Sequence, residues 1–120
     1  TAFPLNAEST RFRLVILGSK VNPEARIGLV WFDAPRPADS RAPRRKVGVG
    51  DMVFVFDVAD AAAVHERLRA AGADIVETPQ AYLSKQQDAA GRPYEGRVFH
   101  VFDPDGNLVE LLEAAKPVTR

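Results

Sequence analysis

The amino-acid sequence predicts an α+β fold, in which the second half of the chain follows a βαβββ order. Three observations predict it. Alternating apolar residues mark a strand over residues 51–58, and apolar residues at i, i+4 and i+7 mark an amphipathic helix over 61–71. Two runs rich in Val, Phe and Leu, at 97–102 and 108–112, flank a turn that contains Pro and Gly. These two runs predict a β-hairpin.

The first half of the chain predicts a second hairpin and then a linker. Residues 11–17 and 26–32 are rich in β-branched and aromatic side chains, and the loop between them contains Asn22-Pro23. We therefore expect two antiparallel strands. Residues 35–46 hold several prolines and basic side chains, which excludes a long helix or a central strand there and predicts an exposed linker.

Local sequence signals predict the helix, a short strand and a loop between residues 60 and 96. Asp60 is a plausible N-cap for the helix, and Gly72 marks its end. His65 falls off the apolar stripe, so we expect it on the surface rather than as a ligand. A short strand is expected over 73–77, and the polar residues 80–96 predict a long loop, either a lid or specificity loop or a mobile one.

Composition excludes several classes of function. A length of 120 residues with 46% hydrophobic content suits one domain with a real core. The formal net charge is zero, so we expect neither a nucleic-acid partner nor an anionic membrane surface. There is no Cys and no apolar run long enough to cross a bilayer, which fits a cytoplasmic protein. The first residue is Thr rather than Met, so we expect that an upstream segment is removed or not included.

Glu110 is the best functional candidate in the sequence. In a strand over 108–112, Leu108, Glu110 and Leu112 share one face, which places a carboxylate between two leucines. A carboxylate on a buried apolar face must be paired, hydrogen-bonded, protonated or bound to a metal. The alternative is a face open to water, on which Glu110 is an ordinary surface charge.

His100 is the second ionisable candidate. The turn places it across the hairpin from Glu110 or Leu111, where the two side chains can form an acid–base pair or join a metal shell. The alternative is a strand histidine that bonds a backbone carbonyl or faces solvent.

The segment DPDGNLVEL, preceded by an aromatic strand and followed by a second acid, resembles the end of a module in the vicinal-oxygen-chelate superfamily. That superfamily holds glyoxalase I, bleomycin-resistance proteins and extradiol dioxygenases. The resemblance implies a curved mixed sheet of βαβββ modules within a single domain over 1–120. Residues 1–34 would be a first module without its N-terminal strand and helix, and 47–115 a second module. Alternatively, one module and an extra hairpin would complete the sheet in a dimer.

The resemblance also implies a divalent metal, Zn, Ni, Fe or Mn, with Glu110 as a ligand. Asp51 stands where the family usually has a histidine ligand, and Asp is a harder oxygen ligand. Val30, at the matching position of the first hairpin, cannot bind a metal.

The implied function is metal-assisted proton transfer, lyase or oxygenase chemistry on a small molecule, with Glu110 and His100 as catalytic residues. The implied partner is a second copy of the chain in a homodimer. A non-catalytic protein that binds a drug or an aromatic ligand is the alternative. Arg97 could meet an anionic substrate, or it is a solvated loop charge. The pocket is expected to be lined by apolar side chains: Val53, Val55, Phe102, Leu108, Leu112 and Trp31.

Overall fold

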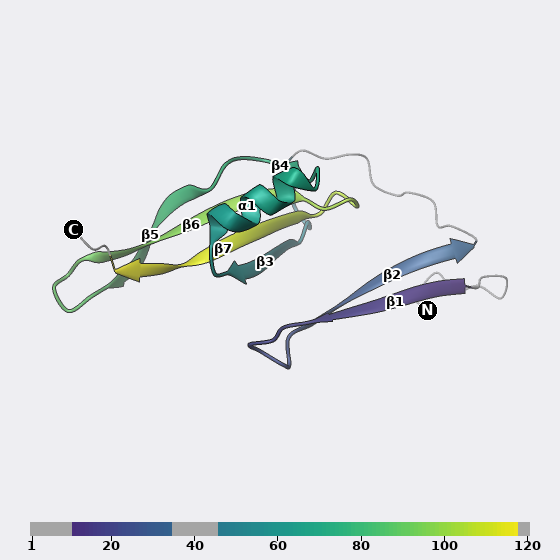
Figure 1. Cartoon of the computed structure of the whole chain (residues 1–120), viewed down its shortest axis with the longest axis horizontal. Coiled ribbons are helices and arrows are strands. Elements are labelled where there is room, and N and C mark those ends of the chain that lie inside the picture. The colour runs from purple at the N-terminus through teal and green to yellow at the C-terminus, as the bar shows by residue number, and fades with distance from the viewer. Residues whose placement is uncertain (1–10, 35–45, 118–120) are drawn as a thin grey trace. The chain divides into compact units, whose positions relative to one another are not determined.

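A computed structural model of the chain describes residues 11–34 and 46–117 (Figure 1). By its internal packing the chain divides into two compact units, Thr1–Ala42 and Pro43–Arg120. The predicted linker over 35–46 falls almost entirely outside the described residues.

The described part of the first unit is an antiparallel hairpin, as predicted. Strand β1 (Arg11–Gly18) pairs with β2 (Arg26–Ala34), with Leu14 opposite Val30. Strand β2 continues two residues beyond its predicted end. The connecting loop is held by the Ser19 hydroxyl oxygen, which accepts hydrogen bonds from the backbone N–H groups of Val21 and Asn22.

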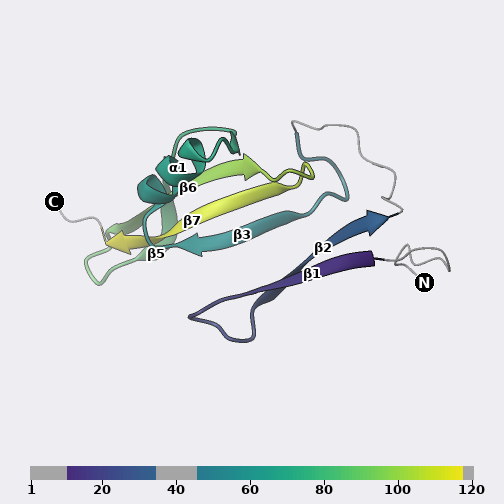
Figure 2. The same cartoon turned by 45° about the vertical axis from the view of Figure 1, so that its right-hand side comes forward.

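The second unit is a five-stranded mixed sheet with one helix. Its strands and helix are β3 (Val53–Val58), α1 (Ala61–Ala70), β4 (Asp74–Ile75), β5 (Gln80–Gln87), β6 (Pro93–Phe102) and β7 (Leu108–Pro117). The strand order is β3-β7-β6-β4, and β5 pairs with the same edge of β6 as β4 does. Strand β3 runs parallel to β7, and the other pairs are antiparallel. Figures 1 and 2 show α1 on one face of this sheet. The predicted α+β class is confirmed.

The core of the second unit lies between α1 and that sheet face. Its buried residues are Ala61, Phe99, Val101 and Leu111, and partly buried apolar side chains surround them. Phe99 is fully buried. The helix contributes Ala61 and the partly buried Val64 and Leu68 to the packing. Alternation along the strands therefore gives β6 and β7 one face toward the helix and one face away from it.

The prediction that His65 lies on the surface is wrong. His65 is only 9% exposed, and its ring stands edge-on to that of Phe99, with 5.4 Å between ring centroids. Residues 61, 65 and 68 also lie on one side of a helix, and the small Ala61 lets that side approach the sheet. The histidine therefore fills core space as an aromatic ring.

The prediction of a long loop over 80–96 is also wrong. Strand β5 covers the first half of that segment and β6 begins at Pro93, which leaves a short turn at 88–92. The Asp88 carboxylate accepts hydrogen bonds from the Arg92 backbone and side chain and holds this turn. The polar residues of β5 are mostly exposed, and backbone pairing with β6 rather than apolar burial makes them a strand.

Two predicted local signals are confirmed. Asp60 caps α1 by accepting a hydrogen bond from the Ala63 backbone N–H. In the turn between β6 and β7, the Asp103 carboxylate accepts from the N–H groups of Asp105 and Asn107, and Gly106 has a φ of +81°. A left-handed φ of this kind favours glycine. This turn fixes the register in which β6 and β7 pair.

Phe99→Ala should destabilise the second unit by about 3–5 kcal/mol, because it removes a fully buried ring and leaves a cavity. Urea denaturation followed by circular dichroism measures this change. Leu83→Ala, at a side chain that is 65% exposed, is the matched control and should stay within about 0.5 kcal/mol of wild type. Equal losses in the two variants would contradict the assigned core.

Gly96→Ala should destabilise the protein by more than about 1 kcal/mol, a cost typical of overpacking. A Cβ atom at Gly96 would lie 2.5 Å from the Glu113 carbonyl oxygen and 2.6 Å from the Tyr82 ring. Gly18→Ala is the control, since a Cβ there meets nothing within 4 Å. Thermal unfolding of both variants checks the difference, and a tolerated Gly96→Ala would mean that β5 and β7 lie further apart.

Candidate functional site

The sheet face that points away from α1 carries the two ionisable candidates. Phe99 and Leu111 pack on the helix side, so their neighbours His100 and Glu110 project from the opposite face. His100 and Glu110 are also direct register partners in the antiparallel pair of β6 and β7. This is the arrangement that the hairpin and its turn predict.

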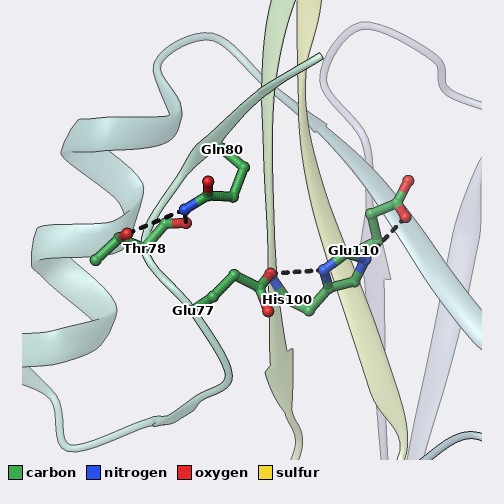
Figure 3. Close-up of polar contacts among 5 residues, drawn as sticks. All are labelled: Glu77, Thr78, Gln80, His100 and Glu110. Atoms are coloured by element: carbon green, nitrogen blue, oxygen red, sulfur yellow. Dashed lines mark hydrogen bonds and ion pairs between the residues drawn. The ribbon is translucent and has the colours of Figure 1, made fainter.

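The imidazole of His100 lies between two carboxylates (Figure 3). Its Nε2 atom is 3.0 Å from Oε2 of Glu110, and its Nδ1 atom is 2.7 Å from Oε1 of Glu77. The same Glu77 oxygen accepts a hydrogen bond of 2.7 Å from the His100 backbone N–H. The three side chains form a continuous row, which we call the Glu77–His100–Glu110 row.

Sequence reasoning missed Glu77, which was expected only as the last residue of a short strand. Strand β4 ends at Ile75, but the Val76 N–H still donates to the His100 carbonyl oxygen at 2.9 Å. This bond continues the pairing with β6 by one residue and brings Glu77 to the imidazole. The available signal was an acid two residues after the end of a short edge strand.

The row is neither fully buried nor fully solvated. The side chains of Glu77, His100 and Glu110 are 31%, 29% and 28% exposed. Burial lowers the pKa of His100, but the hydrogen bonds and negative charges of Glu77 and Glu110 together raise it by more. The net result is a pKa above the usual histidine value, which favours an imidazolium between two carboxylates.

Apolar side chains predicted for the pocket surround Glu110 on the same face. Val55 is the register partner of Glu110 on β3, and Val53 is the partner of Leu108. These two valines are 55% and 40% exposed, so they offer apolar surface. Leu112 and Leu108 are half-buried, and Phe102 is buried opposite Leu108. The structure therefore brings five of the predicted lining residues to one sheet face.

Asp51 is not brought to Glu110. It precedes the first residue of β3, and its carboxylate accepts a hydrogen bond of 2.7 Å from the Gly48 N–H. The register pairs Glu110 with Val55, four residues later, a separation of about 13 Å along an extended strand. The short side chain of Asp51 cannot span that distance.

Neither Arg97 nor Trp31 is among the three side chains of the row. Arg97 is the register partner of Glu113, on the helix side of the sheet, so alternation directs it away from His100. Trp31 belongs to the first unit, where the Arg13 guanidinium is 5.7 Å from its ring centroid. Val30 pairs with Leu14 in the same hairpin. A role for these residues in ligand binding stays a prediction.

The described residues supply an incomplete set of metal ligands. His100 and Glu110 are ligand types for a divalent metal, but both ring nitrogens of His100 contact carboxylate oxygens. Within 11–34 and 46–117, no group of three or more His, Cys, Asp or Glu residues is placed to hold a metal ion. These residues alone therefore do not fit a closed metal site.

One helix packed on a five-stranded mixed sheet, with one strand before the helix, four after it and an acid on the last strand, defines the class of fold. The Glyoxalase/Bleomycin resistance protein/Dioxygenase superfamily matches residues 17–111 of the chain. The chain belongs to this superfamily, whose members often use divalent metals. Among the described residues, no helix combines the length and apolar character required to cross a membrane.

Solved structures give partial similarities. A protein of unknown function from Agrobacterium tumefaciens is 30% identical over 56% of this chain, with a TM-score of 0.36, and this chain spans 44% of its length. An integron cassette protein from V. cholerae is 21% identical over 83% of this chain and 75% of its own, with a TM-score of 0.42. A virulence protein from Salmonella typhimurium is 23% identical over 83% and 76%, with a TM-score of 0.38. A search of the curated proteins finds no match.

The raised pKa of His100 predicts a pH dependence of stability. The folded-state pKa lies above the unfolded value, so the bound proton stabilises the fold fully below about pH 6.5. This contribution is lost as the pH rises through the folded-state pKa. Wild type should therefore lose free energy of unfolding between about pH 6 and about pH 8.5.

Urea denaturation at both pH values checks this, with His100→Gln as the comparison. The drop in the free energy of unfolding should be smaller in that variant, whatever its absolute stability. A variant with the same drop as wild type would show that His100 does not carry the effect.

Proposed function

We propose that the protein binds a small, largely apolar molecule on the sheet face away from α1 and transfers a proton to or from it. The Glu77–His100–Glu110 row carries this proposal, because it places a hydrogen-bonded histidine and a carboxylate among apolar side chains. Superfamily membership supports a small-molecule ligand without naming one.

Glu110 is the proposed base. Its Oε2 atom is taken by His100, while no described residue bonds its Oε1 atom, which remains open for a ligand. The imidazolium of His100 stabilises the carboxylate before the transfer. When Glu110 takes a proton from the ligand, His100 still donates to Oε2 and holds the acid in place.

The apolar surface around the row is the proposed binding surface. Val53 and Val55 are 40% and 55% exposed on β3, next to Leu108 and Leu112 on β7. A bound molecule that covers these side chains removes apolar area from water, at roughly 25 cal/mol per Å². The same cover excludes water from Glu110 and strengthens its electrostatic interactions.

Solvent deuterium exchange tests the proton transfer. We expect the protein, incubated in D2O with a panel of carbonyl compounds that carry acidic C–H groups, to catalyse exchange into at least one of them. Glu110→Gln should lower that rate at least about 100-fold, the scale of one general base. Leu83→Ala is the surface control and should exchange at the wild-type rate. Exchange that survives Glu110→Gln would overturn the assignment.

A binding protein without chemistry is the second candidate, and the exposed valines of β3 favour it. If this candidate is correct, at least one compound of the panel should shift the NMR signals of Val55 and His100, and the protein should catalyse no deuterium exchange into it. Metal-assisted chemistry needs ligands beyond His100 and Glu110. Elemental analysis that finds a stoichiometric metal in the full-length protein, lost in Glu110→Ala, would replace the metal-free proposal.

A further inference from the structure

We infer that Glu77 is a positioning residue, which turns the His100 ring so that Nε2 faces Glu110 and leaves a carboxylate oxygen as the polar group offered to a ligand. The inference rests in part on the proposed function, because the ligand is the molecule bound on that face. The orientation of the ring itself is a property of the free protein.

Glu77 holds the histidine at two points with one oxygen atom. Oε1 contacts Nδ1 of the ring and accepts from the His100 backbone N–H, both at 2.7 Å. A carboxylate bonded only to the ring could move together with the ring when the His100 side chain rotates. The second bond ties the carboxylate to the backbone of β6, so the ring is oriented relative to the strand.

Glu77 is itself held in place. The Val76 N–H donates to the His100 carbonyl oxygen on one side of it. On the other side, the Gln80 side-chain amide donates to the Thr78 carbonyl oxygen at 3.0 Å and contacts the Thr78 hydroxyl at 3.3 Å (Figure 3). These bonds order the bend between β4 and β5 and support the position of the carboxylate.

The arrangement determines which ligand groups the row can recognise. Both ring nitrogens of His100 contact carboxylates, so the imidazole has no nitrogen free to bond a ligand. With His100 charged, the row carries a formal charge of −1, and Glu110 Oε1 is a hydrogen-bond acceptor. The row therefore favours a ligand with an amine or hydroxyl donor and disfavours a carboxylate.

An NMR titration tests the positioning role without a ligand. The chain has only two histidines, so two ring C–H signals are followed, and His100→Gln assigns them. Glu77→Gln keeps an oxygen that can accept the backbone N–H but removes the charge, and we expect a lower pKa of His100. Glu66→Gln removes the carboxylate 3.3 Å from Nδ1 of His65 and is the matched control, with the His100 titration unchanged.

An unchanged His100 titration in Glu77→Gln would overturn the positioning role and leave Glu77 as a bond to the strand backbone. If that variant does not fold, Glu77→Asp keeps the charge but shortens the side chain by one methylene. Loss of contact with the ring should again lower the pKa of His100, and an unchanged value would overturn the inference in the same way.

Three molecules with the same ring test the ligand class: benzylamine, benzyl alcohol and benzoate. Benzylamine and benzyl alcohol should shift the His100 and Val55 signals at concentrations roughly tenfold or more below benzoate, the scale of one hydrogen bond to a charged group. Equal or tighter binding of benzoate would overturn the selection for a donor. If none of the three binds, donor selection and the proposed binding function fail together, while the titration alone decides the role of Glu77.

Discussion

The second unit depends on β6, because this strand pairs with three others. Strand β7 occupies one edge, and β4 and β5 follow one another along the other edge. The same strand presents Phe99 and Val101 to the helix and His100 to the opposite face. The alternation of side chains along this one strand therefore places core residues on one face of the sheet and the Glu77–His100–Glu110 row on the other. A change that slips its register by one residue would bury His100 and expose Phe99, which ties the integrity of the core to that of the row.

Partial burial and the charges of the neighbouring carboxylates have opposite effects on the pKa of His100. Partial burial alone would favour a neutral imidazole, whereas the two carboxylates favour the cation and prevail. The imidazolium in turn reduces the repulsion between Glu77 and Glu110. Each charge is therefore stabilised by its neighbour, and the side chains stay partly exposed, so none pays the full desolvation penalty of a buried ion.

Sequence reasoning succeeded where the determining interactions are local. The Asp60 cap, the Asp103 turn and the alternation around Glu110 each depend on residues a few positions apart, and together they place His100 opposite Glu110. It failed where a residue's contacts, secondary structure or burial depend on a segment far away in the sequence. The contact from Glu77 to His100 spans 23 residues, β5 is a strand because β6 lies beside it, and His65 is buried because Phe99 receives it. The pattern of apolar and polar residues within one segment does not predict which distant segment that segment will contact.

The break between β4 and β5 has an evolutionary consequence. Residues 76–79 belong to no strand, and they carry the carboxylate that orients the imidazole. An insertion or deletion in this bend displaces Glu77 without altering the core side chains of β6 and β7. An evolutionary change in the length of this one connection would therefore alter the protonation of His100 and leave the core around Phe99 in place.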